Sequence, residues 1–336
     1  MDRISIVILN YNGKHHLEQF LPSVIQHSQG HEIVVADNHS SDGSVTMLKL
    51  SFPGVKVLEF DQNYGFCGGY NRALAQLNAD YFVILNSDIE VTKNWIEPVI
   101  SLFRSDKKIA AIQPKLLDFH HKDRFEYAGG AGGFIDRFGY PFCRGRIFDT
   151  IEQDTRQYDD STEIFWASGA CMFIKASLFG EYGGFDESFF AHMEEIDLCW
   201  SMKEDGYKVY YCGNSTVFHV GGGTLTYSNP RKTYLNFRNS LMVIIKHLPV
   251  RELVWKLPFR WAMDYIAVLH FWFLGNFWDG FMILKAHIFI IKNFLSTSKK
   301  RKKRVALLRN QAGIYRAFLL FSYHISGLKK YSDLRF

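Results

Sequence analysis

The sequence predicts an α/β fold built on a mostly parallel sheet. Over residues 1–115, short apolar segments alternate with segments whose apolar residues recur at helical spacing, and the joints between them are short. Strands that alternate with helices in this way form parallel sheets with right-handed crossovers. The chain has 336 residues, of which 47% are hydrophobic and 16% aromatic, so it is large enough to bury a sizeable core.

The elements of this first part follow from two periodicities. Strands are predicted at 4–9, 32–37, 55–60, 81–86 and 109–114, where short apolar runs end in polar residues. One helix is predicted where apolar residues fall at i, i+3, i+4, i+7 and i+8 around Pro22, which favours a kink: Leu17, Phe20, Leu21, Val24 and Ile25. The other helices are predicted at 44–50, 70–77 and 95–103.

The alternation is lost from about residue 115 to 165. This segment is first rich in Gly and aromatic residues and then polar, which predicts a long excursion over the sheet with a hairpin and a mobile loop. Regular structure is predicted again as a strand entering a helix at 164–179, a helix at 194–205 and a strand at 207–212.

A second composition shift near residue 226 predicts an α/β domain over 1–225 and a helical region over 226–336. Residues 259–295 are apolar and aromatic, but their longest run without Asp, Glu, Lys or Arg, Tyr265–Trp278, falls short of the about 20 residues that cross a bilayer. The cationic run KKRKKR at 299–304 follows. We therefore predict an interfacial helical hairpin on a membrane. A buried helical subdomain with a solvated Lys/Arg face is the alternative.

Net charge, cysteine spacing and the absence of common motifs limit the kinds of partner, compartment and cofactor that the sequence indicates. The net charge of +5 is too small to indicate a nucleic-acid partner by itself. The five cysteines form no CxxC pair, which predicts reduced thiols in a cytosolic setting. No signal peptide is predicted, because the N-terminus has no long apolar run with a cleavage site. The absence of GxGxxG after the first strand and of GxxxxGK[ST] argues against dinucleotide and P-loop sites.

Polar residues follow four of the predicted strands. The segments are LNYN at 9–12, ADNHSSDGS at 36–44, DQNYGFCGGYNRAL at 61–74 and NSD at 86–88. One such segment is unremarkable, because Asn, Ser and Asp are common turn residues. Four of them at the carboxyl edge of one sheet predict a ligand-binding rim.

With these segments the chain resembles the family 2 glycosyltransferases of the GT-A fold, and within them the bacterial rhamnosyltransferases of O-antigen or capsule synthesis. The resemblance covers about 1–245 and rests, in this order, on SIVILNYNG, IVVADNHSSDGS, NYGFCGGYNRAL, FVILNSDIEV, WASGACMFIKASLF, GGFDESFFAHMEEIDLCW and YLNFRNSL. It implies an inverting, metal-dependent transfer of a sugar from a nucleotide-diphosphate donor, with dTDP-rhamnose as the first expectation.

The resemblance assigns donor binding to the rim. Asp37 would accept a hydrogen bond from the pyrimidine base, and Asn63 and Arg72 would flank the nucleotide. Gly169, in ASGAC, matches a loop near the sugar and the acceptor. The donor set implied in this way is Leu9, Asn10, Tyr11, Asp37, Asn38, Asn63, Arg72, Asn86, Ser87, Asp88 and Gly169.

The resemblance also implies a divalent metal, Mg²⁺ or Mn²⁺. NSD stands at the position of the family's DxD motif, so Asp88 would hold the metal on the diphosphate, and Asn86 replaces the first Asp. His219 matches a C-terminal metal ligand. The chemistry is coherent, because a hard cation on carboxylate oxygens neutralises a diphosphate leaving group. The alternatives are a turn or helix-capping role for Asp88 and an ordinary core or surface position for His219.

MEE at 193–195 matches the motif whose last residue is the general base. Glu195 therefore stands where the family usually has Asp, and Ser201 replaces a frequent Arg. An acceptor hydroxyl needs a carboxylate to take its proton. Glu194 and Asp197 are the neighbouring candidates, and all three acids also suit the first turn of a solvated helix.

The expected acceptor is a polyprenyl-diphosphate-linked sugar or another saccharide, and the expected location is cytoplasmic, peripheral on the inner face of a bacterial cell membrane. Two alternatives stay open. A processive polysaccharide synthase would carry QxxRW and several spans, which the sequence lacks. A nucleotide-sugar-binding or scaffold protein with impaired catalysis would fit the replacement at Glu195.

Overall fold

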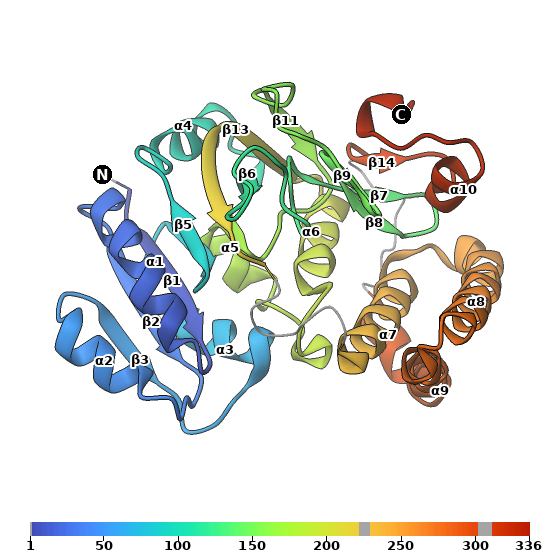
Figure 1. The fold of residues 1–336 in the computed structure, drawn as a ribbon, viewed down its shortest axis with the longest axis horizontal. Helices are drawn as coiled ribbons and strands as arrows, with labels where there is room; N and C mark the ends of the chain where they lie inside the picture. The colour runs from blue at the N-terminus through green and yellow to red at the C-terminus, as the bar shows by residue number, and fades with distance from the viewer. Residues whose placement is uncertain (1, 222–228, 302–310) are drawn as a thin grey trace.

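A computed structural model describes residues 2–221, 229–301 and 311–336 (Figure 1). Within these ranges the main sheet has nine strands, in the order β11-β13-β6-β12-β4-β1-β2-β3, with β5 paired to β13. The strands are β1 (Ile4–Asn10), β2 (Glu32–Asp37), β3 (Lys56–Glu59), β4 (Tyr81–Asn86), β5 (Ile89–Val91), β6 (Ile109–Asp118), β11 (Ser161–Ile164), β12 (Cys171–Lys175) and β13 (Lys208–His219).

The predicted fold class is confirmed. Strands β3, β2, β1 and β4 are parallel neighbours, and β13 runs parallel to β6. Strand β12 lies antiparallel between β4 and β6, so the sheet is mixed. The accompanying helices are α1 (Lys14–His27), α2 (Ser44–Ser51), α3 (Gly65–Leu74), α4 (Glu97–Ser105), α5 (Ala176–Glu181), the short 3₁₀ helix η1 (Glu187–Phe189) and α6 (Glu194–Glu204).

Helix α3 begins five residues earlier than its apolar periodicity predicts. Its first turns contain Gly68 and Gly69, which are poor helix formers in isolation. Packing compensates, because a Cβ at Gly69 would lie 2.6 Å from Leu9 Cδ1 and only glycine lets the helix approach β1 so closely. Close tertiary contact therefore stabilises a helix start that the sequence pattern obscures.

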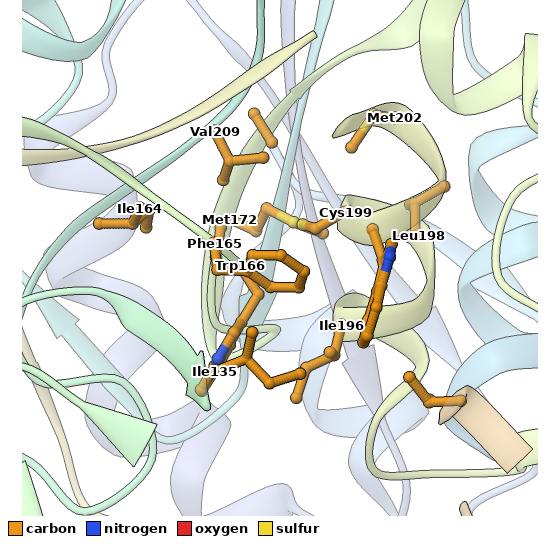
Figure 2. Close-up of a cluster of buried hydrophobic side chains, with 14 of the residues drawn as sticks. Ile135, Ile164, Phe165, Trp166, Met172, Ile196, Leu198, Cys199, Met202 and Val209 are labelled. Carbon is orange, nitrogen blue, oxygen red and sulfur yellow. The ribbon is translucent and has the colours of Figure 1, made fainter. Parts of the chain in front are cut away.

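The sheet is buried on both faces. Alternate residues of β1 point to opposite sides, so Val7 joins one core cluster while Ile6 and Ile8 join the other. Figure 2 shows part of the first cluster, where Cys199 of α6 lies near Met172 of β12. This contact fixes α6, the helix that begins with the two candidate glutamates. All five cysteines are buried and free.

A second, small sheet forms over the excursion. Its five strands run β10-β9-β8-β7-β14, with β7 (Gly133–Asp136), β8 (Pro141–Cys143), β9 (Arg146–Ile147), β10 (Thr150–Ile151) and β14 (Ile314–Tyr315). The antiparallel pair β7–β8 confirms the predicted hairpin. Strand β14 pairs in parallel with β7, so the last part of the chain returns to the excursion, which the sequence did not predict.

The C-terminal region is helical, with α7 (Pro230–His247), α8 (Val250–Phe273), α9 (Phe277–Lys299), α10 (Leu319–His324) and the 3₁₀ helix η2 (Tyr331–Asp333). Helices α8 and α9 lie side by side, so the predicted helical hairpin is confirmed (Figure 1). Among the described residues, no helix is both long and apolar enough to span a bilayer. The proposed boundary near 225 falls in 222–228, outside the described residues, and the division stays a prediction. The cationic run is described only as far as Arg301.

Candidate active site

The carboxyl ends of three parallel strands meet in one place. The register pairs Asn10 of β1 with Asp37 of β2, and Leu9 of β1 with Asn86 of β4. Asn10 Nδ2 donates a hydrogen bond to Asp37 Oδ1 at 2.9 Å. The predicted rim therefore exists as a continuous set of polar groups.

Asp37 lies at the bottom of this rim. It is buried, and its Oδ2 accepts a hydrogen bond from the backbone N–H of Ser40 at 2.8 Å. Each carboxylate oxygen has two lone pairs, so the side chain keeps acceptor capacity for a ligand. Asn10 Oδ1 is buried and has no hydrogen-bond partner among the described residues. A Cβ at Gly13 would lie 2.7 Å from that oxygen, so glycine leaves the space beside it open.

Several residues that were predicted to bind the sugar donor stabilise the loops of the rim. Asn38 Nδ2 donates to Asn63 Oδ1 and to the carbonyl of Gly65, each at 3.0 Å. Arg72 contacts Glu187 at 2.8 Å, and its guanidinium lies 3.7 Å from the centre of the Tyr64 ring. The structure thus engages Asn38, Asn63 and Arg72 in contacts that hold the loop before α3.

The remaining predicted residues lie at the open part of the rim. Tyr11 is 45% exposed, and Ser87 is half-buried at the end of β4. The backbone N–H of Asn86 donates to the carbonyl of Ala170 at 2.9 Å, which places the loop containing Gly169 beside the NSD segment. A Cβ at Gly169 would lie 3.2 Å from the Phe66 ring, so this loop passes closely over α3.

Asp88 and His219 are in direct contact. Strand β5 pairs with β13 and sets His219 opposite Ile89, so His219 Nε2 lies 3.2 Å from Asp88 Oδ1. The other ring nitrogen, Nδ1, forms an ion pair with Glu126 Oε1 at 3.1 Å. Burial by itself would lower the pKa of His219, but the carboxylates of Asp88 and Glu126 outweigh it and raise the pKa to about 10.

Asp88 and His219 offer ligand atoms that suit a divalent metal which also binds a diphosphate. Asp88 offers a carboxylate oxygen, and His219 offers an imidazole nitrogen once a metal displaces the proton from Nε2, while Glu126 is placed to orient the ring from behind. The described residues contain no group of three or more His, Cys, Asp or Glu side chains that would hold a metal by themselves. Mg²⁺ is usually bound by one or two protein ligands together with substrate phosphates and water, so two ligands suffice.

Helix α6 begins with Glu194 and Glu195, and both carboxyl groups have a raised pKa. Burial raises the pKa of Glu194 well above its usual value, and the charges of Glu195 and Asp197 add to the rise. Burial also raises the pKa of Glu195, to about 7. One oxygen of each side chain, Oε2, has no hydrogen-bond partner among the described residues. Glu195 is the more accessible of the two, since Glu194 is only 4% exposed.

Both carboxylate oxygens of Asp197 are bonded to side chains of α7. Its Oδ1 lies 2.8 Å from His247 Nε2, and its Oδ2 accepts a hydrogen bond from Lys246 Nζ at 2.7 Å. Burial would raise the pKa of Asp197, but His247 and Lys246 outweigh it, and the net shift is downward. With both oxygens paired, Asp197 is the least suited of the three acids to accept a proton from a substrate.

Acids beside His219 and at the start of α6 both act on one buried thiol, that of Cys143. Burial raises its pKa to about 12, Arg146 opposes the rise, and the charges of both Glu126 and Glu195 contribute to it. Glu126, which contacts His219, and Glu195 therefore both lie within electrostatic reach of one side chain.

The loop before α6 is strained and is held by α7. Phe190, His192 and Met193 have φ values of 66°, 70° and 72°, a region that costs non-glycine residues about 1–3 kcal/mol each. Asn239 Nδ2 lies within hydrogen-bond distance of the carbonyls of Phe189, Ala191 and His192, at 3.1, 2.8 and 2.7 Å. Arg238 Nη2 donates to the Phe189 carbonyl at 2.7 Å. These two residues come from the YLNFRNSL motif, to which sequence analysis assigned no role.

Asn239→Ala is expected to lower kcat about 10–10²-fold, with KM for the donor within about twofold. The reason is that the released loop would displace the glutamates, and misplacement by about 1 Å costs up to about 10²-fold. Steady-state kinetics with a thermal unfolding control measures this. Asn214→Ala, at an exposed position of β13, is the matched variant and should behave as wild type. A rise in KM with unchanged kcat would contradict a positioning role.

Sequence reasoning missed Glu126, Arg238 and Asn239. Glu126 stands alone in RFEYAGG, where no spacing marks it, and only the fold brings it to His219. A carboxylate next to a Gly-rich stretch was the available signal. Helix α7 buries the adjacent polar residues Arg238 and Asn239, which stand just before the apolar run at 241–245.

The chain matches a protein family and is similar to several known proteins. The family model described as "Glycosyl transferase family 2" matches residues 5–183, more than half of the chain. A similar protein is the N-acetylglucosaminyl-diphospho-decaprenol L-rhamnosyltransferase of Mycobacterium tuberculosis, 24% identical over 90% of this chain and 98% of that protein. Rhamnosyltransferase WbbL of Escherichia coli is 24% identical over 62% of this chain and 80% of that protein.

Solved structures are similar in fold. GalNAc-T7 with UDP, GalNAc and Mn²⁺ superimposes with a TM-score of 0.55 at 17% identity, over 73% of this chain and 48% of that chain. The mannosyltransferase PcManGT of Pyrobaculum calidifontis, with GDP-Man and Mn²⁺, gives a TM-score of 0.53 at 13% identity, over 89% of this chain and 84% of that chain. At these identities the likeness establishes the GT-A fold alone.

Proposed function

As this chain belongs to glycosyl transferase family 2 and is a nucleotide-sugar glycosyltransferase, we propose that it transfers rhamnose from dTDP-rhamnose. The proposed acceptor is a polyprenyl-diphosphate-linked sugar, or another saccharide, in cell-surface polysaccharide synthesis. The names of the similar mycobacterial and Escherichia coli proteins support the choice of sugar, and the mycobacterial name supports the acceptor. A peripheral position on the cytoplasmic face of a bacterial membrane belongs to the same proposal.

One observation carries the proposed chemistry. The contact of Asp88 with His219 at 3.2 Å stands at the carboxyl edge of the sheet, and Glu195 and the histidine's partner Glu126 both lie within electrostatic reach of Cys143. A reaction that expels a diphosphate and deprotonates a hydroxyl requires one acidic group beside a metal and one that faces the acceptor. The site offers both.

In the proposed mechanism, Asp37 accepts a hydrogen bond from the pyrimidine base. Asp88 and His219 would hold Mg²⁺ or Mn²⁺, which when bound neutralises the charge of the departing diphosphate. Glu195 takes the proton of the acceptor hydroxyl, whose oxygen bonds to the anomeric carbon as the bond from that carbon to the diphosphate oxygen breaks. Attack opposite the leaving group inverts the configuration.

A donor screen tests the sugar and the nucleotide. Thermal unfolding is measured with dTDP-rhamnose and other nucleotide sugars, each with Mn²⁺ or Mg²⁺, because a ligand that binds only the folded state raises the melting temperature. We expect dTDP-rhamnose to give the largest rise and to be consumed when a lipid-linked sugar is added. A larger rise and turnover with another donor would replace rhamnose in the proposal.

Asp37→Ala is expected to weaken binding of the nucleoside diphosphate by about 5–150-fold. A buried pyrimidine N–H would lose its acceptor, which costs about 1–3 kcal/mol. Isothermal titration calorimetry measures the change, with Asp149→Ala as a control at an exposed position. Unchanged affinity in the Asp37 variant would mean that this side chain only stabilises the turn at Ser40.

A further inference from the structure

The outer face of the α8–α9 hairpin is apolar. A helix on a protein surface normally turns polar residues outward. Here Phe273 is 89% exposed, Leu295 76% and Trp278 71%. The residues around the turn between the two helices form the densest part of this face, which we name the hairpin tip: Leu269, Phe273, Leu274, Phe277, Trp278 and Phe281, all more than half exposed.

The inner face of the same hairpin is already used. Ile283, Ala286 and Ile290 of α9 are fully buried, and α9 packs against both α7 and α8. The hairpin is therefore apolar on two sides, and packing against the protein accounts for one of them. A buried helical subdomain, the alternative left open by the sequence, explains the inner face only.

Each acidic side chain of the hairpin has a partner: Glu252 pairs with Lys256 of the same helix at 2.6 Å, Asp264 contacts His287 at 2.9 Å, and Asp279 accepts a hydrogen bond from Thr233. Glu252 is thereby paired with a cation, Asp264 is buried and Asp279 is half-buried, so the acids give the outer face little negative charge. The cations Arg251, Lys285, Lys292 and Lys299 are instead exposed. Within the described part of the chain none of these four cations forms an ion pair, so the outer face combines apolar side chains with positive charge.

We propose that the outer face of the α8–α9 hairpin docks on an anionic lipid bilayer, with the hairpin tip inserted at interfacial depth. Aromatic side chains at the tip suit the boundary between headgroups and acyl chains, and the lysines suit anionic headgroups. A second copy of the chain is a poorer occupant, since a shared face would bring rows of like charge together. Membrane docking itself does not depend on the proposed function. Only the idea that the bilayer holds the acceptor rests on it.

The test is sedimentation of the full-length protein with vesicles of phosphatidylcholine alone or with one quarter phosphatidylglycerol. Binding to the anionic vesicles is expected at low salt, and it should weaken as salt screens the charges. The triple variant F273S/W278S/F281S should bind at least about tenfold more weakly, because each large apolar side chain contributes up to 1.5–3 kcal/mol when fully buried. K285Q/K292Q should reduce binding to anionic vesicles and its salt dependence.

The matched control is L50S/I151S, which removes exposed apolar side chains outside the hairpin. It should bind vesicles as wild type does. All substituted positions are exposed, and thermal unfolding of each variant checks that the fold is retained. Failure of the wild type to bind anionic vesicles at low salt would overturn the proposal.

Two further outcomes are distinguishable. A concentration-dependent dimer in light scattering, abolished by the tip variant and unaccompanied by vesicle binding, would identify a second copy as the occupant and overturn the proposal. Failure of the proposed function alone would appear as vesicle binding without turnover of dTDP-rhamnose. Donor turnover on a water-soluble acceptor should be the same in the tip variant and in wild type, because the tip lies outside the active site.

Discussion

Glu195→Gln is expected to lower sugar transfer by about 10²–10⁴-fold, the usual contribution of general acid–base catalysis. Glutamine keeps the shape of the side chain and removes its proton acceptor, so donor binding should remain nearly unchanged. Transfer to the acceptor and affinity for the nucleoside diphosphate are measured on the same preparation. Loss of both together would indicate a structural defect rather than loss of the base.

Glu194→Gln is the matched comparison. Successive residues of a helix point about 100° apart, so only one of the two glutamates can face the acceptor. We expect the Glu194 variant to retain most of its activity, because Glu194 is the more buried and burial, which raises its pKa, disfavours the charged form that a base requires. An inactive Glu194 variant beside an active Glu195 variant would reverse the assignment.

The pKa of Glu195 also predicts two pH effects. Transfer should rise with pH through about 7, as the base loses its proton. Stability should change in the opposite direction. A carboxyl whose pKa is raised on folding holds its proton more tightly in the folded state, so the free energy of unfolding should fall as the pH rises from about 4.5 to about 7. Both effects should diminish in Glu195→Gln.

Asp88→Asn is expected to reduce metal-dependent donor turnover by about 10²-fold or more. A carboxylate that holds a cation on the diphosphate contributes several kcal/mol of charge stabilisation in the transition state, and about 1.4 kcal/mol corresponds to a factor of ten. Asparagine preserves the volume beside His219 and removes the negative charge. Binding of Mn²⁺ in the presence of the nucleoside diphosphate, followed by electron paramagnetic resonance, should weaken in parallel.

The controls for Asp88 separate the metal from the fold. Asp149→Asn, at an exposed position, should turn over donor at the wild-type rate. Melting of Asp88→Asn in the absence of metal and nucleotide reports any loss of structure. Wild-type turnover that persists in excess chelator would contradict the proposed role of Asp88.

The sequence was sufficient for the parallel strands β1 to β4 and for the rim at their ends, whereas the pairings of β5, β11 and β12 were not predicted. Strand–helix alternation over the first 115 residues fixes which ends of β1, β2 and β4 meet, because parallel neighbours present their carboxyl ends on one side. Polar residues at those ends were therefore predictable as neighbours. The pairing of Asn10 with Asp37 follows directly from this arrangement.

Contacts between distant segments were not predictable. Strand β14 has two residues, and its pairing with β7 depends on a partner far away in the sequence. The contacts of Glu126 with His219 and of Asn239 with the loop before α6 likewise have no local pattern. For α8 and α9, which carry apolar and charged residues on both the inner and the outer side, periodicity cannot say which face is covered. Only the packed structure distinguishes the inner face from the outer one.

The return of the chain to β7 has a mechanical consequence. The α8–α9 hairpin is attached to the rest of the molecule at both of its ends. On one side, α7 contacts the loop before Glu194, and on the other, residues 314–315 add a strand to the small sheet. Arg301, just after α9, also contacts the carbonyls of Ile245 and Leu248, so both ends of the hairpin are held against the end of α7 and it cannot swivel as a single tether would. The general base would then stand at a constant height above the surface on which the hairpin rests, and the enzyme would select acceptors by the distance from their lipid anchor to the reacting hydroxyl.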